Sequence, residues 1–350
     1  MSAVKSKSAR SRARAAPDEE TRHAPVHARR PRQRSKPSLA AHRMRRALAR
    51  QWLPFLAVAV ALGAVAALFF RFALHTPAFA LLEGAAIGAG VGLLFVFVRE
   101  VSRNTITTLA SLDKHRGYAV IGAAPELTLR ALRALQPDQR SPFGALAYLP
   151  ASPFATAFRD LQGQVPDKSV VAFLGSRAGE GATTAAVCTA ASATQQGRRV
   201  IVLDCDLRHR SLTDMFDSEP MTGLLHACAH PGAWRDHVEH EAETGVAYIP
   251  IAVAESPWRS VAEGPGLAAL IEHLREAYDC VLLDCPPASS ADGPAIARLA
   301  DQCIVVAAWD ETPLTALRAT VRQLRGARGA TSIFVNRVPP EYRFGRLRPD

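Results

Sequence analysis

Glycines, a threonine pair and several carboxylates occur in this chain at a spacing that could bind phosphate and a metal ion. The segment Ser176–Thr184 reads SRAGEGATT and lies between an apolar run and a helical stretch. A glycine turn between a strand and a helix directs backbone N–H groups at an anion, although such a turn can also be only a tight connection. A complete phosphate-binding loop carries a lysine before its Ser or Thr. Here Ala182 takes that place and Thr183 follows.

Two later segments place carboxylates at the ends of expected strands. VIVLDCDLR, over 200–208, contains Asp204 and Asp206, and YDCVLLDCPP, over 278–287, contains Asp284. The carboxyl ends of parallel strands form the ligand-binding edge of such sheets, and carboxylates there can hold Mg²⁺ directly or through water. We therefore predict a Mg²⁺ site formed by Thr183, Asp204 and Asp284. If the chain is active, the expected catalytic acids are Asp204, Asp206 and Asp284.

The elements that must position these residues alternate between strands and helices. Continuous apolar strands separated by helices indicate a parallel sheet covered on both faces. We therefore predict an α/β, P-loop NTPase-like cytoplasmic domain over 151–340, a linker over 101–150 and a C-terminal tail over 341–350. The expected strands are 169–174, 199–203, 245–251, 280–283, 302–308 and 332–335, and the expected helices are 183–196 and 264–277.

The positive charge of the chain is concentrated at its beginning. Residues 1–50 hold 15 Lys and Arg against three acids, with almost no large apolar side chains. This composition predicts a disordered basic cytoplasmic tail. It is either a solvated topology signal or a contact to anionic lipid headgroups. We expect no nucleic-acid partner, because no aromatic or groove-reading motif accompanies the charge.

Two apolar runs follow this basic segment, at 52–70 and 77–98. Each is long enough to cross a bilayer core of about 30 Å, so the sequence predicts a two-helix transmembrane hairpin over 51–100. The Arg-rich flank before the first run predicts that both termini are cytoplasmic. These features predict a multi-pass protein of the inner (cytoplasmic) membrane.

A cluster of possible zinc ligands lies between the two acidic segments. Its spacing matches no zinc finger, and we predict no zinc site. The cluster consists of His226, Cys228, His230, His237 and His240.

The segments around the glycine turn and the acids resemble the bacterial tyrosine kinases of polysaccharide co-polymerases, a branch of the ParA/MinD-like ATPases. The resemblance extends over roughly 78–338 and includes Asp292 and the Val335-Asn336-Arg337 segment, which looks like the adenine-side motif of the family. It implies ATP or ADP with Mg²⁺ as cofactor. The residues expected to bind the nucleotide are Arg177, Gly179, Glu180, Gly181, Ala182, Thr183, Thr184 and Asn336.

Four departures from the family pattern bear on activity. Ala182 replaces the loop lysine, and Tyr342 stands alone where the family has a tyrosine cluster. The Glu-x-x-Arg-x-x-Arg assembly motif reads Thr156, Arg159 and Gln162, and six residues replace the large domain that the family places between its two spans. Arg177 occupies the place of the signature lysine of ParA-type loops and is a candidate substitute cation.

The resemblance and its departures predict a membrane-anchored, kinase-like nucleotide-binding protein that regulates exopolysaccharide or capsule biosynthesis or export, and that is either a weak enzyme or a pseudo-enzyme. The expected partners are the inner membrane, polysaccharide polymerase or export proteins, a separate co-polymerase with a periplasmic domain, and further copies of the chain. Two alternatives remain: an active ATPase or protein-tyrosine kinase with a non-standard P-loop, and a ParA-like positioning ATPase.

Overall fold

The computed structural model describes residues 119–252 and 260–340 apart from 263, together with scattered residues between 60 and 112. The chain divides into two compact units, residues 1–100 and 101–350. The basic segment 1–50 and the segment 341–350, with Tyr342, lie outside the described residues.

The predicted transmembrane hairpin is not supported. Among the described residues, no helix has both the length and the apolar character that a membrane crossing requires. Much of 52–70 and 77–98 lies outside the described residues. This finding contradicts the predicted multi-pass location in the inner membrane.

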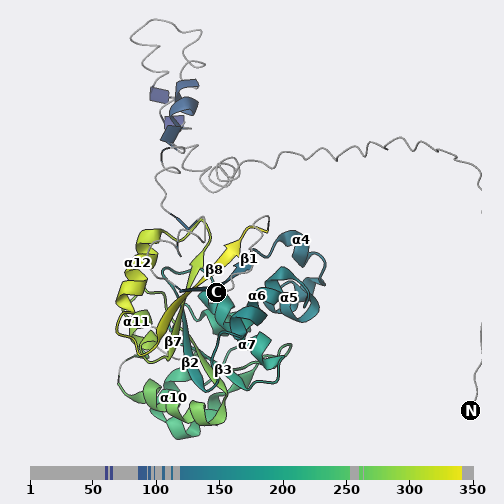
Figure 1. Ribbon diagram of the computed structural model, residues 1–350, viewed down its shortest axis with the longest axis vertical. Helices are drawn as coiled ribbons and strands as arrows, with labels where there is room; N and C mark the ends of the chain where they lie inside the picture. The colour runs from purple at the N-terminus through teal and green to yellow at the C-terminus, as the bar shows by residue number, and fades with distance from the viewer. Residues whose placement is uncertain are drawn as a thin grey trace, which may run out of the picture. The chain divides into compact units, whose positions relative to one another are not determined.

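The second unit is built on one eight-stranded sheet (Figure 1). All neighbouring strands in it are parallel except the pair at the β4 edge. The predicted parallel α/β fold is thereby confirmed. In spatial order the strands are β1 (Ala119–Pro125), β8 (Ala330–Val338), β7 (Gln302–Ala308), β2 (Ser169–Gly175), β6 (Cys280–Asp284), β3 (Val200–Asp204), β5 (Ala247–Ile249) and β4 (Glu239–His240).

The two faces of the sheet bury separate hydrophobic clusters. Along β2, Val170, Ala172 and Leu174 belong to one cluster, whereas Val171 and Phe173 belong to the other. This division follows from the alternation of side chains across a strand. The first cluster includes side chains from α9 (Leu224–Ala229), α10 (Gly266–Ala277), α11 (Asp292–Ala297) and α12 (Leu314–Gln323). The second cluster includes side chains from α5 (Pro142–Tyr148), α6 (Pro153–Gln162), α7 (Ala182–Thr194) and α8 (Ser211–Met215).

Residues 119–148, which the sequence suggested as part of a linker, belong to this unit. β1 pairs with β8 and extends the sheet by one strand. Between β1 and α6 lie α4 (Leu129–Leu132), a 3₁₀ turn η1 (Pro137–Gln139) and α5. Phe143 and Leu146 of α5 are buried in the same cluster as Phe158 of α6.

A second 3₁₀ segment, η2 (Pro231–His237), precedes β4.

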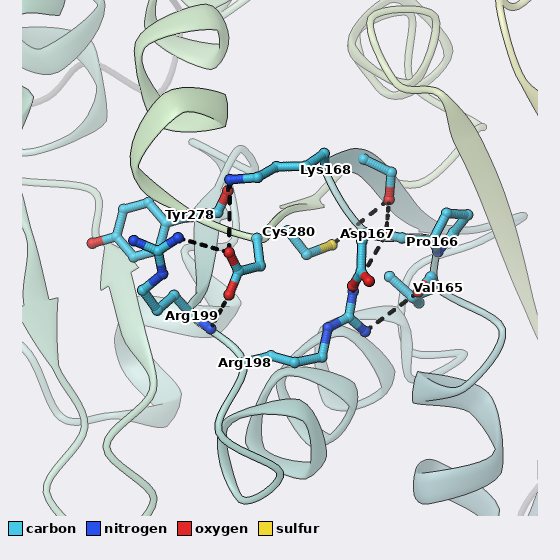
Figure 2. A network of polar contacts seen from close by, with 10 residues as sticks. Val165, Pro166, Asp167, Lys168, Arg198, Arg199, Tyr278 and Cys280 are labelled. Atoms are coloured by element: carbon cyan, nitrogen blue, oxygen red, sulfur yellow. Dashed lines mark hydrogen bonds and ion pairs between the residues drawn. The ribbon is translucent and has the colours of Figure 1, made fainter.

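A polar network ties together the starts of three central strands (Figure 2). The Asp279 carboxylate, just before β6, accepts hydrogen bonds from the Arg199 backbone N–H at 2.9 Å and from its guanidinium at 2.8 Å. Lys168 Nζ lies 3.6 Å from the same carboxylate, and Arg198 pairs with Asp167 at 2.6 Å. The network lies at the amino ends of the strands, so the carboxyl ends are the edge available to a ligand.

Candidate functional site: a phosphate-binding loop beside buried carboxylates

The glycine turn joins the end of β2 to the start of α7. Gly179 and Gly181 adopt φ values of +82° and +94°, which glycine reaches without the penalty that a Cβ imposes. Gly181 is the N-cap of α7. The first N–H groups of an α-helix have no acceptor within the helix, and the helix dipole favours an anion there. The start of α7 is therefore suited to binding phosphate.

Glu180 fixes the shape of the loop from inside. Its carboxylate accepts hydrogen bonds from the backbone N–H groups of Ser176 at 2.6 Å and Arg177 at 3.1 Å. The hydroxyl of Thr312 donates to the other carboxylate oxygen at 2.7 Å. Burial raises the pKa of Glu180. Because Glu180 is only 5% exposed and engaged by the protein, its role is to hold the loop, although its residue position belongs to the predicted nucleotide site.

The far end of β8 braces the loop from the other side. The Asn336 side-chain amide donates to the Glu180 carbonyl at 3.2 Å. The Arg337 guanidinium donates to the Gly179 carbonyl at 2.7 Å and to the Glu311 carboxylate at 3.0 Å. Asn336, expected to lie on the adenine side, thus contacts the loop backbone. Arg337 was not among the predicted site residues, although it is the last residue of the Val335-Asn336-Arg337 segment that carried the resemblance.

Asp204 and Asp284 are direct neighbours on adjacent parallel strands, β3 and β6. Both are buried, with exposed fractions of 0% and 1%. Burial raises the pKa of both carboxyl groups. Repulsion by Asp204 raises the pKa of Asp284 further, and a hydrogen bond from the Thr183 side chain offsets part of this rise. The two acids therefore lie close enough to repel each other beside the start of α7.

The two carboxylates differ in how the protein satisfies them. One oxygen of Asp204 accepts from the Thr213 N–H at 2.9 Å and hydroxyl at 2.7 Å, and the other accepts from the Asp206 N–H at 3.3 Å. Asp284 Oδ2 is buried without a hydrogen-bond partner among the described residues. A buried carboxylate oxygen without a partner is costly, and a metal ion or its water is the usual remedy. Thr183 and Asp284 therefore fit Mg²⁺ better than Asp204 does.

Asp206 points to a different partner. One of its oxygens accepts the backbone N–H groups of Arg208 and His209, each at 3.2 Å, and the other lies 2.8 Å from His209 Nδ1. His209 was not predicted as a site residue. Its three-residue spacing from Asp206 is the signal that could have identified the pair.

Two cavities open at this edge of the sheet. One of about 280 Å³ is lined by the loop and the start of α7 together with Asp206, His209 and Arg337. The other, of about 240 Å³, is lined by Arg208, Ser290 and Asp292 among others. Four lining residues are common to both: Ala178, Asp206, His209 and Pro287. Of the predicted nucleotide residues, the larger cavity is lined by Arg177, Gly179, Glu180, Gly181, Ala182, Thr183 and Thr184.

Asp204, Asp284 and Asn336 are buried and do not line this cavity, but the Thr183 side chain hydrogen-bonds Asp284 and the Asn336 amide donates to the Glu180 carbonyl. The possible zinc ligands gather elsewhere, around α9 and η2, where the rings of His226 and His237 lie 6.2 Å apart. The absence of zinc stays a prediction.

Comparisons with known proteins show what this chain is similar to. A family model described as an AAA domain matches residues 168–329. EpsB of Ralstonia solanacearum, named as a tyrosine-protein kinase, is 25% identical over 270 residues, which cover 74% of this chain and 36% of that protein. The succinoglycan biosynthesis transport protein ExoP of Rhizobium meliloti is 27% identical over 265 residues, which cover 67% of this chain and 34% of that protein. The chain thus spans about a third of the length of these relatives.

Solved structures show the same fold. The kinase domain of the Escherichia coli tyrosine kinase ETK matches with a TM-score of 0.60 at 19% identity, covering 70% of this chain and all of that one. The BceF tyrosine kinase domain matches with a TM-score of 0.56 at 21% identity, covering 67% of this chain and all of that one. The chain is thus similar in sequence to a protein named as a tyrosine-protein kinase and to a succinoglycan biosynthesis transport protein, and it has the fold of bacterial tyrosine kinase domains.

Proposed function

We propose that this domain binds a nucleoside di- or triphosphate with Mg²⁺ and acts as a kinase-like regulator of exopolysaccharide biosynthesis or export. The observation that carries the proposal is that Asp284, which has one buried oxygen without a partner among the described residues, is hydrogen-bonded by Thr183, which lines the cavity at the start of α7. The name of ExoP, a succinoglycan biosynthesis transport protein, supports the link to exopolysaccharide, and the name of EpsB, a tyrosine-protein kinase, supports the likeness to a kinase.

In this proposal the residues of the chain have separate tasks. The N–H groups of the loop and of the start of α7 bind phosphate oxygens, and Glu180 keeps the loop in shape. Thr183 and Asp284 would hold Mg²⁺, and Asp204 adds negative charge beside them. The ion would neutralise phosphate charge.

We further propose that phosphoryl transfer is slow or absent. The loop lysine stabilises the charge that spreads over the phosphoryl group in the transition state. Ala182 cannot do so. The protein would then act through its nucleotide-bound shape on polysaccharide polymerase or export proteins.

The test restores the missing cation. We expect Ala182→Lys to tighten Mg-ATP binding to the full chain about ten- to a hundredfold, since a charge-assisted hydrogen bond contributes about 1.5–3 kcal/mol. Isothermal titration calorimetry measures the affinity, and transfer from radiolabelled ATP measures turnover. Gln195→Lys adds the same charge at the exposed C-cap of α7 and serves as control.

Binding of Mg-ATP by the wild type, improved by Ala182→Lys but not by Gln195→Lys, supports the proposal. If neither the wild type nor Ala182→Lys binds at millimolar ATP, the nucleotide function is refuted. Transfer by the wild type at the rate of Ala182→Lys would instead refute the slow-transfer part. For the biological role, deletion of the gene should change the amount of secreted polysaccharide, and Asp284→Asn should fail to restore it.

A further inference from the structure

The cavity at the start of α7, here called the phosphate cavity, has no lysine at position 182, but the guanidinium of Arg337 is fixed beside it. Ala182 lines the cavity without charge, and Arg337 from β8 lines the same cavity. In sequence the two residues are far apart, and the sheet brings them together because β8 and β2 both flank β7. A site that holds several phosphate charges needs a compensating positive group.

Arg337 is held in a defined position by the protein. Its guanidinium donates to the carbonyl of Gly179 at 2.7 Å and to the Glu311 carboxylate at 3.0 Å. These contacts use two of the five N–H donors that a guanidinium carries. The side chain is 42% exposed, so its remaining donors have access to a ligand in the cavity.

The backbone also directs Arg337 toward the loop. Its φ of +57° lies in the left-handed region, which is uncommon for a residue with a Cβ. Hydrogen bonds hold this conformation: the Arg337 N–H donates to Asn336 Oδ1 at 2.9 Å, and the Asn336 amide donates to the Glu180 carbonyl at 3.2 Å. Strain of this kind persists where the surroundings enforce it, and it clusters at functional sites.

Arg177 is the other arginine that lines this cavity. Its backbone N–H donates to Glu180, but its side chain is exposed and has no hydrogen bond among those of the described residues. An exposed, unanchored arginine loses side-chain entropy when it binds phosphate, whereas Arg337 is already ordered by its contacts. The geometry therefore favours Arg337.

We propose that Arg337 is the phosphate-binding cation of this site and takes over the charge that Ala182 does not supply. This inference rests on the proposed nucleotide function and deepens it. Arg337 donates to phosphate oxygens from β8, and the backbone N–H groups at the start of α7 donate to the same phosphates. The site is thereby suited to nucleotides with two or three phosphates and selects against the unphosphorylated nucleoside.

The test compares affinities of the full chain for Mg-ATP and, by competition, for adenosine. We expect Arg337→Ala to weaken Mg-ATP binding about ten- to a hundredfold while leaving adenosine affinity unchanged. Arg337→Lys keeps the charge but loses the planar donor geometry, so its Mg-ATP affinity should fall between the two. Arg322→Ala removes the same charge from the exposed face of α12 and should bind as the wild type does.

Two further variants separate a charge effect from damage to the loop. Glu311→Gln removes the ion-pair partner of Arg337 without removing the arginine, so Mg-ATP affinity should stay equal or increase. Arg177→Ala should change Mg-ATP affinity less than Arg337→Ala does. If Arg337→Ala folds, its loss of Mg-ATP affinity tests the inference directly. If Arg337→Ala unfolds the chain, the Mg-ATP affinities of Arg337→Lys and Glu311→Gln test it instead.

The outcomes are distinct. Wild-type Mg-ATP affinity in Arg337→Ala, or a larger loss in Arg177→Ala, overturns the role of Arg337 and leaves the proposed nucleotide function standing. An equal loss of ATP and adenosine affinity in Arg337→Ala shows that the residue only supports the loop, which also overturns the inference. Failure of the wild type to bind Mg-ATP refutes the proposed function and this inference with it.

Discussion

Substitution of Gly181 by alanine tests whether β8 shapes the phosphate loop. Gly181 has a φ of +94°, and a Cβ built there would lie 2.1 Å from Asn336 Nδ2. The left-handed conformation costs a residue with a Cβ about 1–2 kcal/mol. The clash must in addition displace the Asn336 amide from the Glu180 carbonyl, and loss of such a hydrogen bond costs about 0.5–1.5 kcal/mol. We therefore expect Gly181→Ala to lower the free energy of unfolding by about 1.5–3.5 kcal/mol.

Gly179→Ala is the matched control in the same loop. Gly179 also has a positive φ, +82°, but a Cβ there would meet nothing within 4 Å. This variant should lose only the backbone term, about 1–2 kcal/mol. Urea denaturation of the full chains, with the transition followed by tryptophan fluorescence, measures both values. The difference between the two variants isolates the contact with Asn336.

A double variant strengthens the comparison. In Gly181→Ala combined with Asn336→Ala the clash disappears, so the two substitutions should destabilise the protein by less than the sum of their separate effects. Equal destabilisation by Gly179→Ala and Gly181→Ala, together with additivity in the double variant, would refute the reasoning that Asn336 packs on the loop.

Two further predictions concern the buried carboxylate of Asp284 and the partly buried carboxylate of Asp279. Asp284→Asn should raise the free energy of unfolding at pH 7 without Mg²⁺ by about 1–3 kcal/mol, because it removes a buried charge beside Asp204. The same variant should abolish any rise in melting temperature with added Mg²⁺. A variant less stable than the wild type without Mg²⁺ would contradict this prediction. Hydrogen bonds from Arg199 lower the pKa of Asp279 to about 2. A folded pKa below the unfolded value of about 3.9 stabilises the protein above about pH 4 and is lost as pH falls through about 2. Denaturation midpoints measured from pH 5 to pH 2 should therefore fall more steeply for the wild type than for Asp279→Asn, and parallel curves would exclude this contribution.

Much of the core architecture could be read from the sequence. The apolar runs at 169–174 and 280–283 predicted strands, and both appear in the structure with one further residue each. Because parallel strands carry their carboxyl ends to one edge, the expected neighbourhood of the glycine turn, Asp204 and Asp284 followed from chain order alone. Ala182 needed no structure to be recognised as a missing lysine.

Hydropathy was a poorer guide. The runs at 52–70 and 77–98 have the length and composition of membrane spans, but such a run fixes only how much apolar surface is available. A span also requires a continuous helix, and the described residues contain none of sufficient length. The role of 119–125 as an edge strand was missed for a related reason. Its pairing partner β8 lies some 210 residues later in the chain, and a local pattern carries no information about such a partner.

The sequence by itself determined the loop, the acids and the position along the chain of the strands that carry them. These features depend on local pattern and on the rule that the carboxyl ends of parallel strands lie at one edge of the sheet. Only the tertiary structure decided how each acid is used: Thr213 satisfies Asp204, His209 pairs with Asp206, and one oxygen of Asp284 is left unpartnered among the described residues. It also brought Asn336 and Arg337 against a loop more than 150 residues earlier in the chain. Side-chain direction and long-range packing decide these contacts, and neither is encoded in the spacing of residues along the chain.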